Sequence, residues 1–155
     1  MPSFRTTRRV PFSPRQMFDL VADVERYPEF LPFCEALLVK KRDRNGGKDS
    51  LIADMSVGYM AIRETFTTRV TFDPAQLAVQ AQGTEASRGP FRQLENRWQF
   101  SAAPGGCDVD FFIAYEFKSR VLGMLMGAMF EAAFRRFAGA FERRADAVYR
   151  RVSTS

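Results

Sequence analysis

The sequence predicts an α+β fold, in which a curved antiparallel sheet of about seven strands wraps around one long C-terminal helix. Three observations predict it. Segments of alternating apolar and polar residues, separated by turn signals, fill residues 36–118, which is typical of antiparallel strands joined by short turns. Residues 119–152 contain no proline and repeat apolar side chains every three or four positions, as an amphipathic helix does. The chain of 155 residues shows no linker, so we expect one domain, 1–152, and a tail, 153–155.

The first expected elements are an edge strand and a short helix. Residues 4–10 alternate weakly between apolar and polar side chains, which predicts the strand. Ser13, Pro14 and Gln16 stand in the order of an N-cap, a first-turn proline and a capping box, so a helix should begin there. Apolar residues then recur at helical spacing, and Pro28 is expected to end this helix.

Six further strands follow in the sequence. The clearest has Phe66, Val70 and Phe72 on one face and polar residues on the other. Turn-forming residues at Asn45-Gly46, at Asp73-Pro74 and in 103–107 separate the segments. A straight helix cannot follow a strongly curved sheet along its whole length, so we expect a space between them that could hold a ligand. The six strands are predicted at 36–43, 50–62, 64–72, 77–83, 93–102 and 108–118.

The composition excludes several kinds of chemistry. The chain has 16 Phe and 7 Met but no His, so it can form no Ser-His-Asp triad, no Cys-His pair and no histidine metal site. We therefore expect no catalytic residue, no metal and no cofactor. The abundant Phe and Met form either an ordinary core or the wall of a cavity for a lipid-like ligand. Cys34 and Cys107 form either one disulfide or two buried thiols of a reducing cytosol.

Charge and hydropathy bear on location and partners. A net charge of +5 allows weak attraction to RNA or to anionic lipid headgroups, and nothing indicates DNA as a partner. Arg5, Arg8 and Arg9 interrupt the N-terminal segment before any signal-like apolar run forms. The longest uncharged apolar run, 121–130, is about half the ~20 residues that a membrane span needs. We expect a cytoplasmic protein that is soluble or lies peripherally at the inner membrane.

The segment RYPEFLPFCEA, 26–36, places aromatic side chains where Pro28 and Pro32 break regular structure. Two interpretations are open. The loop is either a plug that packs over one end of the core, or a gate at a cavity mouth. As a gate, Phe30, Leu31 and Phe33 would cover an apolar ligand or dip into a bilayer surface.

The expected C-terminal helix has an unusual first half, because Gly123 and Gly127 lie four residues apart among apolar side chains. Each glycine costs about 1 kcal/mol relative to alanine, so either a strand approaches closely or the helix leaves room for a ligand. Few polar groups could orient a ligand head: Tyr59 and Tyr115 on predicted inward faces, and Asn96, which shares a face with Trp98. The nearest charges are Arg63, Glu64 and Glu116.

Three motifs resemble one known family. They are YPEFLPFC at 27–34, GPFRQLENRWQF at 89–100 and AFRRFAGAFERRADAVY at 133–149. With these motifs the chain resembles the coenzyme-Q-binding proteins of the START-like, helix-grip superfamily, also labelled polyketide cyclase/dehydrase-like. The resemblance covers nearly the whole chain, and the bacterial ribosome-association toxins resemble it equally in these motifs.

The resemblance implies a seven-stranded sheet that grips the C-terminal helix around a hydrophobic tunnel. It implies that a bacterial-type cytoplasmic protein binds ubiquinone or a related polyisoprenoid lipid, as a carrier or chaperone that supports cellular respiration without catalysis. Transient contact with the membrane would accompany transfer. The expected tunnel mouth is Tyr27, Pro28, Phe30, Leu31, Pro32 and Phe33. The expected sheet wall is Pro90, Phe91, Leu94 and Trp98. The strand pattern adds Tyr59 and Tyr115 on predicted inward faces. The expected helix wall is Val121, Leu122, Met124, Leu125, Met129, Phe130, Phe134 and Phe137.

Two alternatives remain. A ribosome-binding regulator of translation is indicated by the basic balance and by arginines near the C-terminus, although Glu131, Glu142 and Asp146 partly neutralise them. A polyketide cyclase or aromatase would have to use Tyr59, Tyr115 or Arg63, since no acid-base pair is evident. The arginines are Arg135, Arg136, Arg143, Arg144, Arg150 and Arg151.

Overall fold

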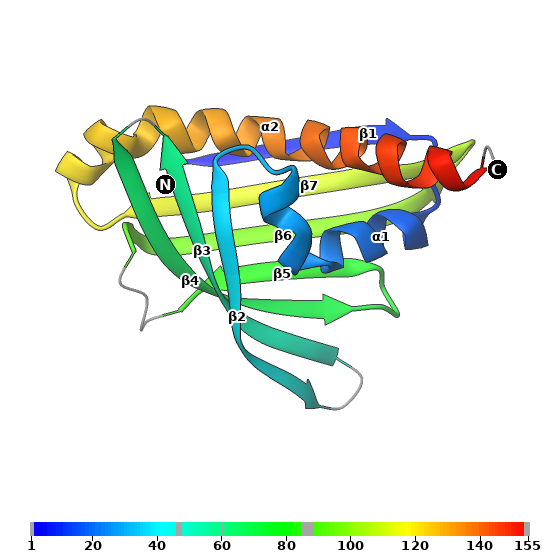
Figure 1. Cartoon of the computed structure of the whole chain (residues 1–155), viewed down its shortest axis with the longest axis horizontal. Coiled ribbons are helices and arrows are strands. Elements are labelled where there is room, and N and C mark those ends of the chain that lie inside the picture. Colours follow the sequence, from blue (N-terminus) through cyan, green and yellow to red (C-terminus); the bar gives the residue numbers. More distant parts are fainter. Residues whose placement is uncertain (1, 46–47, 60, 85–88, 154–155) are drawn as a thin grey trace.

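The structure, a computed structural model, describes residues 2–45, 48–59, 61–84 and 89–153 and confirms the predicted fold class. One antiparallel sheet of seven strands curves around the C-terminal helix α2 (Arg120–Ser153) (Figure 1). Neighbouring strands follow the order β1-β7-β6-β5-β4-β3-β2, so only the β1–β7 pair joins distant parts of the chain. The strands are β1 (Ser3–Val10), β2 (Cys34–Asn45), β3 (Lys48–Tyr59), β4 (Ile62–Asp73), β5 (Ala78–Gly83), β6 (Phe91–Ala103) and β7 (Gly106–Phe117).

The short helix α1 (Pro14–Ala22) begins as predicted. The backbone N–H of Gln16 donates to Ser13 Oγ at 3.1 Å, and the backbone N–H of Ser13 donates to Gln16 Oε1 at 2.9 Å, which completes the capping box. The helix ends before Pro28, contrary to the prediction. Asp23 leaves the helical conformation, and a 3₁₀ helix η1 (Val24–Glu29) follows and contains Pro28.

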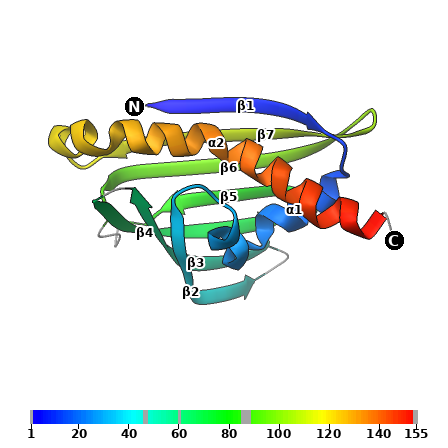
Figure 2. The same ribbon diagram turned by 45° about the horizontal axis from the view of Figure 1, so that its top comes forward.

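All three helical segments lie on one face of the sheet. Figure 2 shows α2 crossing the strands, with α1 and η1 beside its C-terminal half. The sheet bends toward them, and irregularities in the strand register after Cys34 and Val39 in β2 and after Phe91 in β6 help it to curve. The described helices include none with the length and apolar character that a membrane span requires.

Aromatic rings join the sheet to α2 in the core. Trp98 of β6 lies 4.7 Å from Phe111 of β7 and 4.9 Å from Phe141 of α2, measured between ring centroids. Cys34 and Cys107 are free and buried, which decides for two thiols rather than a disulfide. Burial raises the pKa of both thiols to about 11, so they stay protonated at neutral pH.

Some sequence predictions concern parts of the chain outside the described residues. These are Gly46 in the predicted turn after β2, residues 85–88 in the loop before β6, and the last two residues of the predicted tail. The side chains of Arg150 and Arg151 are also outside the described set, although their backbone belongs to α2.

The two glycines in the first half of α2 do not mark the close approach of a strand. A Cβ atom at Gly123 would lie 3.5 Å from the Phe117 ring, an ordinary contact, and a Cβ atom at Gly127 would meet nothing within 4 Å. Close approach is therefore the wrong explanation for Gly127.

We expect Gly127→Ala to raise the free energy of unfolding by about 0.5–1 kcal/mol, because alanine fits the open space and favours the helix. Gly106→Ala is the opposite control, since its Cβ atom would collide with the carbonyl oxygen of Val10. That variant should be clearly destabilised. Urea unfolding monitored by circular dichroism measures both, and a destabilised Gly127→Ala variant would contradict this account of α2.

Candidate functional site

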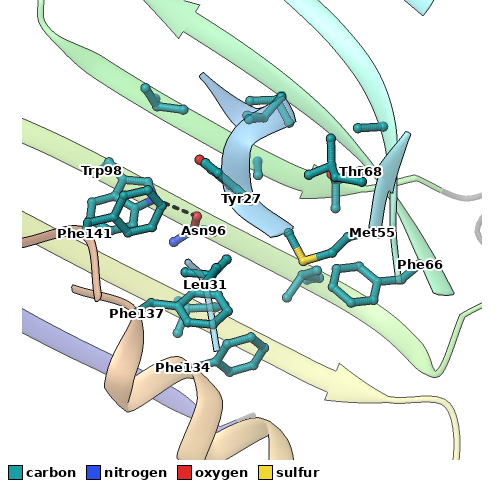
Figure 3. Close-up of a pocket in the computed structure, with 18 residues that line it drawn as sticks. Tyr27, Leu31, Met55, Phe66, Thr68, Asn96, Trp98, Phe134, Phe137 and Phe141 are labelled. Carbon is teal, nitrogen blue, oxygen red and sulfur yellow. Dashed lines mark hydrogen bonds between the residues drawn. The ribbon is translucent and has the colours of Figure 1, made fainter. Parts of the chain in front are cut away.

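A cavity of about 70 Å³ lies between the concave face of the sheet and the helical segments η1 and α2 (Figure 3). It occupies the space that we expected between a straight helix and a curved sheet. Its wall combines side chains from β2 to β7 with side chains from η1, the loop after it and α2. The lining residues are Val24, Tyr27, Leu31, Leu37, Ala53, Met55, Phe66, Thr68, Val70, Val79, Ala81, Leu94, Asn96, Trp98, Ile113, Phe134, Phe137 and Phe141.

The periodicity of the elements places these side chains. In β4, Phe66, Thr68 and Val70 alternate with residues that face outward, so all three reach the cavity from one strand. In α2, Phe134 and Phe137 stand three residues apart, one turn along the same face. The cavity wall therefore follows from the inward faces of ordinary strands and one helix.

The polar side chains of the wall are mostly occupied by bonds within the protein. The indole N–H of Trp98 donates to Asn96 Oδ1 at 3.0 Å (Figure 3), and Asn96 Nδ2 donates to the carbonyl oxygen of Phe112 at 2.9 Å. The Tyr27 hydroxyl donates to the carbonyl oxygen of Val21. Burial raises the pKa of Tyr27 far above its ordinary value, so this phenol remains neutral.

None of the lining residues carries a charge. Two of the three charged residues considered from the sequence pair elsewhere: Arg63 with Glu35 at 3.1 Å, and Glu116 with Arg92 at 3.4 Å. The described residues include no cluster of three potential metal-binding side chains. The chemistry that this wall can supply is the burial of apolar surface, with the neutral polar groups of Tyr27, Thr68 and Asn96 within it.

A second, smaller void of about 10 Å³ lies toward the first half of α2. It is lined by Pro32 and Phe33 of the loop and by Met129 and Phe130 of α2, among others. Four side chains border both spaces and stand between them: Met55, Phe66, Phe134 and Phe137. Within the part of the chain that the structure describes, a shared partition thus separates these two small voids, whereas the resemblance implied a continuous tunnel.

The loop after η1 is packed into the core. Leu31 is only 4% exposed and Tyr27 only 9%. The Phe30 ring lies 5.0 Å from Phe141 between ring centroids, and the Arg144 guanidinium lies over it at 5.1 Å. This packing favours the plug interpretation for the loop, and the gate that would insert Phe30 and Leu31 into a bilayer stays a prediction.

Comparison with known proteins agrees with this fold and cavity. Residues 10–142 match the family described as polyketide cyclase/dehydrase and lipid transport. The chain belongs to this family. It is 32% identical to the ribosome association toxin RatA of Rickettsia prowazekii over 148 residues, 96% of this chain and 99% of the toxin. It is 33% identical to the mitochondrial coenzyme Q-binding protein coq10 of Schizosaccharomyces pombe over 123 residues, 79% of this chain and 73% of that protein.

The fold is shared with solved START structures. A START superfamily protein from Mycobacterium smegmatis superposes with a TM-score of 0.75 at 19% identity, over 94% of this chain and 98% of that one. At this identity the likeness concerns the fold alone. Together with the family match it confirms the START-like resemblance predicted from the sequence motifs.

The structure brings ten of the sequence-predicted site residues to the two voids. The remaining ten lie elsewhere in the core or at the surface. Six line the main cavity: Tyr27, Leu31, Leu94, Trp98, Phe134 and Phe137. Pro32, Phe33, Met129 and Phe130 line the smaller void. The others are Pro28, Phe30, Tyr59, Pro90, Phe91, Tyr115, Val121, Leu122, Met124 and Leu125.

Four of these ten positions are exposed, which corrects the predicted inward orientation. Val121 is 63% exposed, Met124 85% and Leu125 65%, whereas Met126 and Met129 are the buried methionines of this part of α2. Tyr59 is 42% exposed at the end of β3, where its ring packs against Phe33 at 5.2 Å. Tyr115, in contrast, faces inward as predicted, but aromatic rings surround it and it does not reach the cavity.

Sequence reasoning missed most of the cavity wall contributed by the strands. The signal was present, since Phe66 and Val70 were expected on one face of their strand and both line the cavity. Asn96 shares the inward face with Trp98, as predicted. The missed residues are Val24, Leu37, Ala53, Met55, Phe66, Thr68, Val70, Val79, Ala81, Ile113 and Phe141.

We expect Leu31→Ala to lower the free energy of unfolding by about 2–5 kcal/mol, because it removes a buried side chain from the core. Leu38→Ala is the matched control: Leu38 is 64% exposed on β2, so its truncation should change stability by no more than about 0.5 kcal/mol. Chemical denaturation compares the two. Equal, small effects would show that the loop is a loosely held gate.

Proposed function

We propose that this protein binds a polyisoprenoid lipid, with ubiquinone as the first candidate, and carries it in support of respiratory electron transport. The observation that carries the proposal is the cavity itself, which lies within the fold and is lined by apolar and neutral side chains. The similarity to a protein named for binding coenzyme Q supports this choice of ligand. We further propose a cytoplasmic carrier that visits the inner membrane transiently.

An isoprenoid tail is long, flexible and apolar. Burial of its surface contributes roughly 25 cal/mol per Å², and this contribution requires no hydrogen-bond pattern. Rings such as Phe66, Phe134 and Phe137 offer a large apolar area, and Met55 adds a side chain that adapts its shape. The few neutral polar groups among them suit a quinone head, which is itself uncharged.

The size of the cavity sets a condition on binding. A volume of about 70 Å³ is well below the ~300–1,000 Å³ of typical small-molecule sites. Ligand entry therefore requires side-chain movement. Movement of the side chains that separate the two voids would enlarge the cavity most, because it would join the two spaces. Rotation of Met55, Phe134 and Phe137 would join the cavity to the space beside Pro32 and Phe33. In this proposal the isoprenoid tail extends from the main cavity into the space beside Pro32 and Phe33.

We infer a carrier rather than an enzyme, because the cavity wall offers no acid-base pair. A cyclase would need a proton donor and acceptor near its substrate. Arg63 is 59% exposed and Glu116 41% exposed, and neither lines the cavity. Tyr59 is also exposed. The two relatives compared above are named for binding and for ribosome association.

The similarity to the ribosome association toxin over 148 residues favours one second candidate, association with the ribosome. On the last part of α2, Arg135 pairs with Glu131 at 3.1 Å and Arg144 with Glu29 at 2.7 Å. Arg136 is exposed beside these pairs and gives this face a basic character.

If the ribosome is a partner, the protein should co-sediment with large ribosomal subunits at low salt and be released as salt rises. Arg136→Glu should then weaken co-sedimentation. The control is Arg69→Glu, at an exposed position on β4. Absence of co-sedimentation at low salt would exclude this candidate and leave the lipid proposal untouched.

For the lipid proposal we expect Ala81→Leu to reduce quinone uptake by about tenfold or more, because the added side chain fills the cavity. The single tryptophan, Trp98, lines the cavity, so quenching of its fluorescence by a soluble ubiquinone analogue reports binding directly. Overpacking should cost only ~1–3 kcal/mol of stability, which denaturation can check.

The matched control is Ala102→Leu, the same change at an exposed position of β6. It should bind the quinone analogue as the unchanged protein does. Unchanged quenching in Ala81→Leu would show that the cavity is not the binding site. Mass spectrometry of lipid extracted from the purified protein provides a second, independent readout of what the cavity holds.

A further inference from the structure

The first turns of α2 are apolar on their outer side as well as on their inner side. Val121, Met124 and Leu125 are 63%, 85% and 65% exposed, and their spacing of three and four residues places them on one stripe of the helix. Met126 and Met129 of the same helix are, in contrast, buried. A surface helix ordinarily turns polar residues outward, so this stripe, which we call the outer stripe, requires an explanation.

The outer stripe is confined to one end of the molecule. Farther along α2, the exposed positions are mainly charged, among them Glu131, Arg135 and Arg136, and Val148, near the other end, is 36% exposed. In Figures 1 and 2 the start of α2 lies at the end of the fold opposite the C-terminus, beside the end of β7. The stripe is thus a local feature of one pole rather than a property of the whole helix.

The charges next to the outer stripe are mainly positive. Lys118 and Arg120 directly precede it and are exposed, and residues 117–130 contain no Asp or Glu. The carboxylates that border this segment, Glu116 and Glu131, pair with Arg92 at 3.4 Å and with Arg135 at 3.1 Å. The Arg92 side chain reaches the same pole, where it donates to the carbonyl oxygen of Lys118 at 3.2 Å and to Glu116 at 3.4 Å. The N-terminal end of the α2 dipole adds positive potential.

We propose that the outer stripe docks this protein onto an anionic lipid bilayer. Apolar side chains on a helix flanked by cations are the combination that lies in a membrane interface, where the side chains enter the headgroup–acyl boundary and the cations meet lipid phosphates. Three exposed apolar side chains are far fewer than the roughly 20–30 residues that each partner contributes to a stable protein interface. A second copy would also gather Lys118 and Arg120 of both chains around one interface, whereas residues 117–130 offer no carboxylate to pair with them.

Docking here would place the interior voids next to the bilayer. Met129 and Phe130, which line the smaller void, lie one turn beyond Leu125 on α2. The idea that docking brings the voids to the bilayer for lipid exchange rests on the proposed lipid function. Docking itself depends only on the outer stripe and its cations. The membrane contact predicted from the sequence at Phe30 and Leu31 is thereby moved to a different element.

Flotation of the full chain with vesicles tests the proposal. We expect binding to phosphatidylcholine vesicles that contain phosphatidylglycerol, weaker binding to pure phosphatidylcholine, and release at high salt. Met124→Glu combined with Leu125→Glu should reduce binding by about tenfold. Both positions are exposed, so thermal unfolding should stay close to that of the unchanged protein.

Leu38→Glu is the matched control, because Leu38 is 64% exposed on β2 and has basic neighbours, Lys40 and Lys41. It should bind anionic vesicles normally. No flotation of the unchanged protein, an equal loss in Leu38→Glu, or full binding by the double variant would each overturn the proposal. The proposal would also be overturned if sedimentation showed a dimer that the double substitution disrupts and the unchanged protein did not bind vesicles.

Trp98 quenching by a soluble quinone analogue separates the two proposals. The double variant should keep this quenching, since neither Met124 nor Leu125 lines the cavity. Lost flotation with retained quenching supports docking by the outer stripe and leaves the cavity function intact. Flotation without any quenching supports docking and contradicts quinone binding.

Discussion

The structure depends on the mismatch between a straight helix and a curved sheet. Helix α2 has 34 residues, a length of about 51 Å at 1.5 Å per residue. It cannot touch every strand closely, and aromatic rings fill the distance. Near one end of the contact, Trp98 packs on Phe111 and Phe141, and near the other, Phe91 packs on Phe130 at 4.8 Å. Trp98 and Phe141 of the first group line the cavity together with Phe66, Phe134 and Phe137, and these rings do not fill the space.

The sequence predicts the elements well because each leaves a local signal. Ser13 and Gln16 predict the start of α1, and the alternation of apolar and polar residues predicts the strands of the sheet. The cavity wall is harder to predict, because strand alternation tells which residues face inward and not which inward residues remain unpacked. The first turns of α2 carry no usable signal of orientation: Val121 and Met129 are equally apolar, so periodicity cannot separate the exposed side from the buried one. Only the packing of Met126 and Met129 against the sheet decides it.

The chemistry of the wall governs how selective the cavity can be. A charged or strongly polar site distinguishes ligands by hydrogen bonds, and removal of one partner is costly. Here Asn96, Trp98 and Tyr27 are bonded within the protein, so a ligand meets chiefly carbon. Selection must then come from length, width and flexibility. A small volume bordered by aromatic rings and by Met55, whose unbranched side chain adapts its shape, favours a flexible tail over a rigid, bulky ring system.

The two faces of α2 allow one fold to support separate interactions. Its inward face, with Phe134, Phe137 and Phe141, can adapt to a lipid without altering the surface. Its outward face changes from apolar at the start to charged farther on, so membrane and macromolecular contacts would occupy different stretches of the same helix. Relatives of nearly equal identity that are named for coenzyme Q binding and for ribosome association are therefore compatible with one architecture. Overall identity does not separate these activities, because the residues that we propose for lipid binding and for ribosome association form small, different sets on α2.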